Sequence, residues 1–345
     1  MSRRTSEGIL VWLPSPMGDA VLAIPALRAL RQGYPDRPIT FVATPMVRDL
    51  LSPECFNDAW IDVPGRGLPV AAIRRAGCDR AVLLKNSFGC ALAVFTAGVP
   101  QRVGYARDAR RLLLTEAVPV PREAEGRYRR EPMIDYYLRL ARRLGCRTDD
   151  RRLELPLDPA ADLTLAGKLP ALARPGCPVV VLVCGGAFGP SKCWPADRFA
   201  RLADRLAEGY RATVVLLVAP NDAERAIAER IVHHARHPLI NVADSPLSIA
   251  EVKALIAQTD LVIANDTGPR HIAIALQRPV ITLFGPNDPA WTQTGYADEV
   301  QIVGQAPCVP CEKPRCRQER HMCMESIAVD TVFAAAATIL GRDRP

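Results

Sequence analysis

The chain alternates short apolar runs with longer segments in which apolar residues recur at helical spacing. The apolar runs that predict buried strands span residues 9–13, 39–43, 80–84, 178–184, 213–218, 261–264 and 280–284. The segments that predict helices span residues 18–32, 90–97, 136–144, 197–206, 222–233, 249–257, 269–276 and 327–340. Strands that alternate with helices are typical of parallel sheets with helices on both faces. We therefore predict an α/β fold.

The alternation falls into two halves, separated by a proline- and charge-rich stretch at residues 151–178. A chain of 345 residues is also too long for one ordinary domain. We predict two Rossmann-like domains, residues 1–165 and 175–345, with parallel sheets that face a central cleft. Ligands of such sheets bind at the carboxyl ends of the strands, so the loops that follow strands are where chemistry is expected.

The composition excludes a disordered or fibrous chain, because 49% of the residues are hydrophobic. No apolar run approaches the roughly 20 residues that cross a bilayer. The apolar patch near the N-terminus is interrupted by Pro14, Pro16 and Asp19 before it resembles the core of a signal peptide. We therefore expect a cytoplasmic protein.

The net charge is +7, and the basic residues are mostly arginine: only five of the 44 are lysines. The arginines are densest between Arg102 and Arg152. Because guanidinium groups pair with phosphates in a bidentate manner, this segment is typical of a surface that meets an anionic partner or a membrane. A solvated basic face that reflects arginine-rich coding is the alternative. Arg102 and Arg107 are candidate acceptor-binding residues within the segment.

The first loop that follows a strand contains Pro14-Ser15-Pro16-Met17-Gly18-Asp19. Asp19 falls in the first turn of the next helix, where the helix dipole stabilises a carboxylate. A carboxylate facing the cleft could instead act as a general base towards an acceptor hydroxyl. The spacing alone does not decide between these roles.

Two further loops are suited to binding phosphate. Residues 184–195 contain Gly185, Gly186 and Gly189, end near Lys192, and combine free backbone amides with one ammonium group, although the P-loop order is absent. Residues 264–271 place Asp266-Thr267-Gly268 before a helix with Pro269 near its start, which points amide donors at one spot. His271 is either a satisfied helix histidine or a ligand contact. The Gly-Pro and Asp-Pro pairs of residues 284–289 are ordinary turn sequences with a structural role.

Several common catalytic motifs are missing. The sequence contains no Asp-x-Asp element for a metal-bound nucleotide, and no HExxH, GxSxG or GxGxxG motif. Zinc hydrolases, serine hydrolases and common dehydrogenases therefore lose their main support.

Taken together, these segments resemble glycosyltransferase family 9, the lipopolysaccharide heptosyltransferases, and most closely the heptosyltransferase II type. Four segments are similar to motifs of that family: Met17-Gly18-Asp19, the run from Gly186 to Pro195 (GAFGPSKCWP), the run from Asn265 to Ala273 (NDTGPRHIA), and Leu283-Phe284-Gly285-Pro286. Arg102-Val103-Gly104-Tyr105 is similar as well, and the resemblance extends over about residues 8–340.

The resemblance implies a GT-B fold and an inverting, metal-independent transfer of heptose from ADP-L-glycero-β-D-manno-heptose to the inner core of lipopolysaccharide. It implies that Asp19 is the general base and that Lys192 stabilises the ADP leaving group. The donor contacts that it implies are Gly186, Ser191, Asp266, Thr267, Gly268 and His271. In this scheme residues 1–165 bind the acceptor and residues 175–345 bind the ADP-sugar. Preorganised donors that neutralise charge would make a metal dispensable, so no catalytic cofactor is expected.

The implied partners are the ADP-heptose donor, a phosphorylated lipid-linked core oligosaccharide, and peripheral contact with the cytoplasmic face of the inner membrane, without nucleic acid. Two alternatives remain open: an ADP-sugar glycosyltransferase with a non-lipopolysaccharide acceptor, and a non-catalytic nucleotide-sugar binding protein. The joint presence of Asp19 and Lys192 argues against the second, because a pure binder needs no base.

The sequence departs from the family pattern at two positions. Cys193 replaces the arginine that usually precedes Trp-Pro, which puts one phosphate contact in doubt. Arg270 replaces a residue that is usually hydrophobic, and could compensate for the missing arginine.

Four of the eleven cysteines cluster in the segment 308–323, before the last predicted helix: Cys308, Cys311, Cys316 and Cys323. A tetrahedral thiolate zinc site with a structural role is one interpretation of this spacing. Reduced free thiols and disulfides are the alternatives, and a catalytic metal is not expected here.

Overall fold

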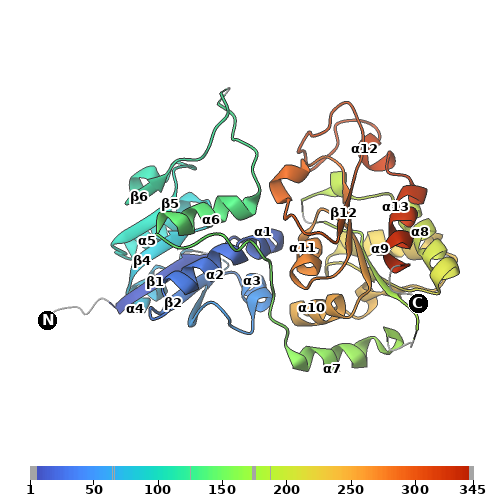
Figure 1. Cartoon of the computed structure of the whole chain (residues 1–345), viewed down its shortest axis with the longest axis horizontal. Coiled ribbons are helices and arrows are strands. Elements are labelled where there is room, and N and C mark those ends of the chain that lie inside the picture. The colour runs from blue at the N-terminus through green and yellow to red at the C-terminus, as the bar shows by residue number, and fades with distance from the viewer. Residues whose placement is uncertain are drawn as a thin grey trace. The chain divides into compact units, whose positions relative to one another are not determined.

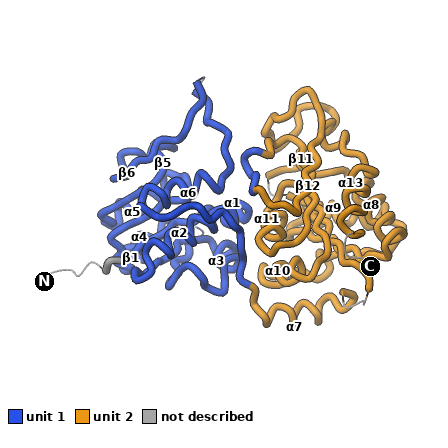
Figure 2. The backbone as a smooth tube through the Cα atoms, viewed as in Figure 1, with its two compact units in different colours: residues 1–156, 290–294 blue, residues 157–289, 295–345 orange. Residues whose placement is uncertain are grey.

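The computed structural model describes residues 6–63, 65, 67–124, 126–172, 176–186 and 188–341. These residues form two compact units (Figure 2). Unit 1 consists of residues 1–156 and 290–294, and unit 2 of residues 157–289 and 295–345. The division falls earlier than residue 165 because the helix of residues 159–168 packs against unit 2, where Lys168 pairs with Glu251.

Unit 1 contains a six-stranded parallel sheet with the strand order β3-β2-β1-β4-β5-β6 (Figure 1). Its strands are β1 (Ser6–Trp12), β2 (Ile39–Ala43), β3 (Ala59–Asp62), β4 (Cys78–Leu83), β5 (Gln101–Tyr105) and β6 (Glu116–Val118). Its helices are α1 (Met17–Leu22), α2 (Ile24–Gly33), α3 (Pro45–Leu51), α4 (Val70–Ala76), α5 (Phe88–Thr96), the 3₁₀ turn η1 (Arg111–Leu113) and α6 (Met133–Arg143).

Unit 2 contains a second six-stranded parallel sheet, with the order β12-β11-β10-β7-β8-β9. Its strands are β7 (Val179–Val183), β8 (Thr213–Leu217), β9 (Ile240–Asn241), β10 (Leu261–Asn265), β11 (Val280–Phe284) and β12 (Glu299–Val303). Its α-helices are α7 (Pro159–Lys168), α8 (Ala196–Tyr210), α9 (Asp222–His234), α10 (Ile249–Ala257), α11 (Gly268–Ala275), α12 (Met322–Glu325) and α13 (Val329–Leu340). Both sheets place the first strand of their unit inside the sheet, with strands added on either side of it, as Rossmann-like sheets do.

The prediction of an α/β fold with two Rossmann-like sheets is therefore confirmed. The central strands are buried along their whole length, as their continuous apolar sequences require. None of the helices in the described part of the chain has both the length and the apolar character needed to span a bilayer.

Two predicted elements differ from the structure. The single helix expected at residues 18–32 is divided into α1 and α2 at Ala23, because Pro25 has no backbone N–H to continue the first helix. The stretch of residues 151–178, expected as a connection, contains α7, which Asp158 caps by accepting a hydrogen bond from the backbone N–H of Ala160.

Candidate functional site

The glycine-rich loop of unit 2 follows β7, and its glycines are needed where other chain segments approach closely. A Cβ added at Gly185 would lie 2.0 Å from Oε2 of Glu224, so this carboxylate lies directly over the loop. Gly189 has a φ of +144°, and a Cβ there would lie 2.3 Å from the carbonyl oxygen of Pro314. The hydroxyl of Ser191 donates to the carbonyl of Lys313 at 2.6 Å. The loop is thus held in one shape by the segment that follows β12.

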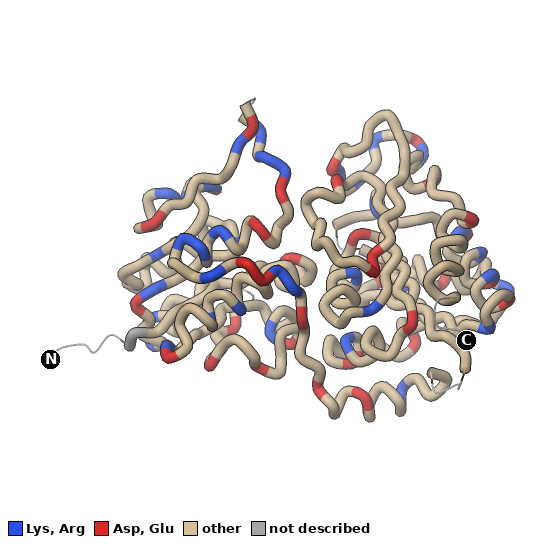
Figure 3. The backbone as a smooth tube through the Cα atoms, in the orientation of Figure 1, with Lys and Arg blue, Asp and Glu red and all other residues tan. Residues whose placement is uncertain are grey.

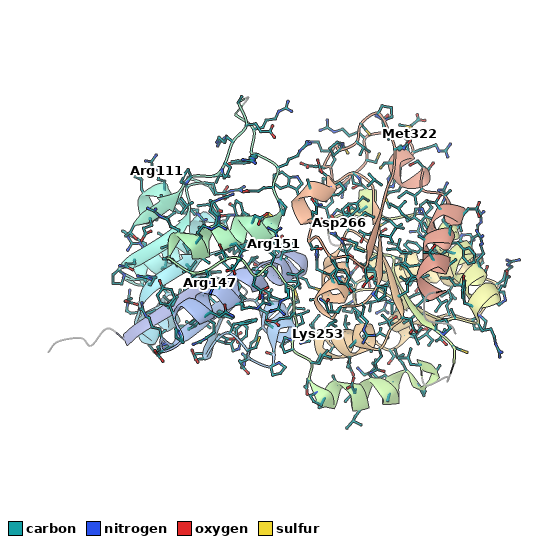
Figure 4. The ribbon with its side chains drawn as sticks, viewed as in Figure 1. Arg111, Arg147, Arg151, Lys253, Asp266 and Met322 are labelled. Carbon is teal, nitrogen blue, oxygen red and sulfur yellow. The ribbon has the colours of Figure 1, made fainter. Side chains whose placement is uncertain are left out.

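Lys192 and Asp266 form a buried ion pair between the two loops that the sequence singled out. Nζ of Lys192 donates to Oδ2 of Asp266 at 2.8 Å and to its backbone carbonyl at 2.9 Å, and lies 4.7 Å from the ring centre of Phe188. Asp266 directly follows β10 (Figure 4). Burial alone would raise the pKa of Asp266, but the charges of Lys192 and Arg270 outweigh it and hold the pKa at about 2. The pair therefore keeps an ammonium group fixed at the carboxyl edge of the sheet.

Arg270 extends this pair into a buried network. Its side chain is fully buried and connects Oδ1 of Asp266, at 3.1 Å, with Oε1 of Glu299, at 2.7 Å. The hydroxyl of Thr282 donates to the same oxygen of Glu299 at 2.6 Å. Arg270 thus pairs with two buried carboxylates, and its compensation for the missing arginine at position 193 stays a prediction. Cys193 itself is half-buried, and burial raises the pKa of its thiol.

His271 is buried and uncharged. Burial first, and then the charge of Arg270, lower its pKa to about 3. Within the described residues, Nδ1 of His271 has no hydrogen-bond partner, and neither do the buried Oδ1 atoms of Asn265 and Asn287. All three residues lie near Asp266. Asn265 precedes it in the chain, Nδ2 of Asn287 donates to its Oδ2 at 3.3 Å, and His271 contributes to lowering its pKa. Buried polar atoms that lack a partner are costly, so their concentration here indicates a place where a polar ligand or water completes the structure.

Thr267 and Gly268 lie where the loop becomes α11. Thr267 is the N-cap residue, and Gly268 is the first residue of the helix. No capping hydrogen bond is made by the Thr267 side chain, whose hydroxyl is instead 3.2 Å from the carbonyl of Asn265. A helix N-terminus without a side-chain cap can accept an anion from outside the protein.

In unit 1 the half-buried Asp19 lies in the first turn of α1, in the segment that follows β1. Its charge contributes, after burial, to raising the pKa of the buried Tyr137 on α6, so the two side chains are close. Nζ of Lys85, just beyond β4, donates to the hydroxyl of Ser15 at 2.8 Å. Asp19 and Lys85 thus lie at the carboxyl ends of two adjacent strands.

A buried arginine organises this edge of unit 1. Arg110 is fully buried and donates to the carbonyl of Lys85 at 2.6 Å, to Oδ1 of Asn86 at 2.6 Å and to the carbonyl of Tyr105 at 3.0 Å. Asn86 then donates through Nδ2 to the hydroxyl of Tyr136 at 2.9 Å. The loops after β4 and β5 are therefore fixed to each other and to α6.

The structure brings Arg107, but not Arg102, to this edge. Arg107 hydrogen bonds to Tyr136, and its charge acts on Tyr137 beside Asp19. Arg102 lies near the beginning of β5 and donates to the carbonyls of Leu113, Val99 and Pro100. Its guanidinium group is used to hold a turn at the opposite end of the strand. Binding of an acceptor by either arginine stays a prediction.

The arginine-rich segment is less available for anions than its sequence suggests. In Figure 3 basic and acidic positions are interspersed along the chain between β5 and α7. Ion pairs with carboxylates are formed by Arg107, Arg139, Arg143, Arg147, Arg151 and Arg152. Much of this segment therefore neutralises its own acidic residues.

All four cysteines of the segment 308–323 are free thiols in the structure, as are the other seven. Burial raises the pKa of Cys323, and the charges of the other three thiols add to this, so the four sulfur atoms share one neighbourhood. Across the described residues, however, no group of three or more His, Cys, Asp or Glu side chains is arranged to hold a metal ion. Structural zinc at these cysteines stays a prediction.

Several residues of both edges were not among the predicted site residues: Lys85, Asn86, Arg110, Glu224, Asn287 and Glu299. Lys85 and Asn86 directly follow a predicted strand, and their place at its carboxyl end is a signal for a site. Glu299 and Arg110 gave no signal, because buried charges cannot be distinguished from exposed ones before their partners are known.

The sequence profile of glycosyltransferase family 9 (heptosyltransferase) matches residues 70–322. The chain belongs to this family and is a glycosyltransferase.

Among its relatives, lipopolysaccharide heptosyltransferase 2 of Salmonella typhimurium is 31% identical over 309 residues, which cover 82% of this chain and 84% of the relative. Escherichia coli ADP-heptose lps heptosyltransferase II has a similar structure, with a TM-score of 0.79, 24% identity and coverage of 97% and 99% of the two chains. E. coli heptosyltransferase WaaC, solved with ADP-2-deoxy-2-fluoro heptose, gives a TM-score of 0.64 at 18% identity over 97% and 99%. These similarities confirm the predicted GT-B fold.

Proposed function

We propose that this protein transfers heptose from ADP-L-glycero-β-D-manno-heptose to the inner core of lipopolysaccharide, with inversion and without a metal. The observation on which the proposal rests is the buried Lys192–Asp266 pair at the carboxyl edge of the unit 2 sheet, next to an uncapped helix N-terminus. The relatives named above support the substrate class, since one is a lipopolysaccharide heptosyltransferase and another was solved with an ADP-heptose analogue.

The donor is proposed to bind unit 2 through its diphosphate. Two of the three N–H donors of Lys192 go to Asp266, which leaves the third for a phosphate oxygen. Amide groups at Thr267 and Gly268, and that of Gly186 in the glycine-rich loop, would supply further donors. The backbone N–H of Ser191 donates to the carbonyl of Pro314 at 3.3 Å, so Ser191 is proposed to fix the shape of the loop. Glu224 over Gly185 is suitably placed to accept from ribose hydroxyls, as acidic residues do beside other Rossmann phosphate loops.

The chemical step is proposed to use Asp19 as general base and Lys192 as the group that neutralises the leaving diphosphate. Asp19 removes the proton of the acceptor hydroxyl while that oxygen attacks the anomeric carbon from the face opposite ADP. The bond between the anomeric carbon and the diphosphate oxygen breaks, and ADP leaves with its electron pair. Because Asp266 and Arg270 hold the site together in advance, Lys192 needs no reorganisation when the charge develops.

The proposal includes metal independence. The negative charge that a divalent cation would balance meets an ammonium group that the protein fixes in place. No cofactor is assigned a role in the transfer.

The proposed acceptor is a phosphorylated, lipid-linked core oligosaccharide bound by unit 1. Lys85, which donates to Ser15, and Arg107, whose charge acts on Tyr137 as that of Asp19 does, would supply cations at the same carboxyl edge of that sheet. A water-soluble donor and a lipid-linked acceptor meet at a membrane surface, so we place the enzyme at the cytoplasmic face of the inner membrane.

The decisive experiment measures ADP release from ADP-heptose, with and without a Kdo-lipid A acceptor that already contains one heptose. Asp19→Asn should abolish acceptor-dependent release while ADP-heptose still binds in calorimetry, and Asp36→Asn, at an exposed position of unit 1, is the matched control. Binding of the donor without transfer to this acceptor, while another acceptor is used, would move the proposal to a non-lipopolysaccharide glycosyltransferase. Failure of the wild type to bind ADP-heptose would refute the proposal.

A further inference from the structure

The helix α5 of unit 1 exposes an apolar stripe. Phe88 is 47% exposed and Phe95 is 49% exposed, and the half-buried Leu92 lies between them. These positions follow the spacing i, i+4, i+7, so they lie on one face of the helix. The opposite face is buried in the core of unit 1 through Cys90, Ala91, Ala93 and Val94. The helix is therefore apolar on both sides, although one side is open to solvent.

The stripe continues onto neighbouring elements. The 3₁₀ turn η1 contacts α5 and contains Leu112, which is 93% exposed. The link is made by Arg102, which lies 5.3 Å from the ring centre of Phe95 and donates to the carbonyl of Leu113. At the other end of the helix, Leu68 is 41% exposed and lies beside Gly89. We call this surface the α4–α5–η1 face.

The charges that these elements place around the stripe have one sign. Arg74 and Arg75 on α4 and Arg111 on η1 are exposed, and Figure 4 labels Arg111. Arg74 also donates to the carbonyl of Thr96, which joins α4 to the end of α5. The sequences of α4, α5 and η1 contain no aspartate or glutamate. The three elements thus combine exposed apolar side chains with arginines and no carboxylate.

We propose that the α4–α5–η1 face binds the surface of an anionic lipid membrane, with its apolar side chains in the interface and its arginines on the lipid phosphates. Apolar side chains bordered by cations are the two features that give peripheral proteins affinity for anionic bilayers. A second copy of this chain fits less well. A twofold dimer through this face would bring the same arginines together without any carboxylate from these elements to pair with them.

The orientation of α5 gives the face a use in the reaction. The helix begins after the carboxyl end of β4, the edge where Asp19 and Lys85 lie, and runs back along the sheet. A membrane bound along α5 therefore borders the edge at which the acceptor is proposed to bind. This purpose rests on the proposed function, whereas binding to lipid does not.

The test is flotation of the full-length protein with vesicles of phosphatidylethanolamine and phosphatidylglycerol, and with vesicles of phosphatidylcholine. The wild type should float with the anionic vesicles, and the double variant Phe95→Ser/Leu112→Ser should bind them at least about tenfold more weakly. Leu163→Ser is the matched control, because Leu163 is 80% exposed on α7 of unit 2. Light scattering of each variant reports the oligomeric state, and melting temperature reports folding.

Loss of flotation in the double variant alone, with an unchanged melting temperature, supports the proposal. Equal binding by the double variant and the wild type would overturn it, as would wild-type binding that is the same for neutral and anionic vesicles. A change from dimer to monomer in the double variant, without vesicle binding by the wild type, would assign the face to a second copy instead. Transfer to a lipid-free acceptor separates the two proposals, because the double variant should retain it.

Discussion

Replacing Arg270 with methionine, a long side chain without charge, tests the buried network most directly. Arg270→Met removes the cation that pairs with Glu299, a carboxylate that is 3% exposed. It also removes the ion pair between Arg270 and Asp266, while the pair between Lys192 and Asp266 remains. Removing one partner of a buried ion pair typically costs about 3–5 kcal/mol, because the other charge stays buried. We expect a loss of this size in the free energy of unfolding of unit 2.

The matching substitution is Glu299→Gln, which removes the negative charge and keeps an oxygen for the hydroxyl of Thr282. In the wild-type background it should destabilise the protein, since it weakens the partner of Arg270. In the Arg270→Met background it should instead restore about 2 kcal/mol or more of the free energy of unfolding, because the buried carboxylate that lost its partner is replaced by a neutral amide. The same change is thus predicted to have opposite signs in the two backgrounds.

The assay is equilibrium unfolding in urea, followed by tryptophan fluorescence, with the buried Trp194 reporting on unit 2. Arg201→Met, at an exposed position of α8, serves as a control and should stay within about 0.5 kcal/mol of the wild type. An equal effect of Glu299→Gln in both backgrounds would contradict the prediction, because the two side chains would then be energetically independent.

Three other outcomes follow from the site. Lys192→Gln should lower kcat by about 10²–10³-fold and weaken ADP binding, and an unchanged kcat would remove Lys192 from the mechanism. His271 has a pKa of about 3 in the fold and an ordinary value of 6.5, so the unfolded chain binds its proton first as the pH falls. The free energy of unfolding should therefore decrease below pH 6.5 with a contribution of about 1.4 kcal/mol per pH unit from this residue, and His271→Gln should remove that contribution in urea titrations at several pH values. Transfer should proceed at full rate after dialysis against EDTA, and loss of activity restored by a divalent cation would contradict a metal-independent step.

Elements with a strong local signal were predicted correctly. The bounds of β2, β11 and α10 agree with the predicted ranges 39–43, 280–284 and 249–257. In α10, Ser248 and Glu251 form a capping box that fixes the beginning of the helix. Short edge strands such as β6 and β9 were missed, because three or two residues give no periodicity to detect.

The candidate site was predictable as a set of loops but not as a set of contacts. Lys192 and Asp266 are 74 residues apart, and only the adjacency of β7 and β10 in the sheet brings their loops together. Arg110 shows the same limit, since arginine is ordinarily exposed and nothing local indicates that it is buried beneath Lys85 and Asn86. The motifs therefore identify the loops but not the contacts between them, because the strand order that brings the loops together depends on the whole chain.

The strand order also bears on how the protein reaches its folded state during synthesis. The six strands of the first sheet lie within residues 6–118, and the six of the second lie within residues 179–303. Among the described strands, each sheet contains strands from one half of the chain only. A ribosome that adds about 5–20 residues per second leaves about 3–12 seconds between the end of the last strand of the first sheet, at Val118, and the beginning of the first strand of the second, at Val179. The first sheet can thus assemble on the nascent chain, and its apolar surface is covered before the second sheet offers competing strands.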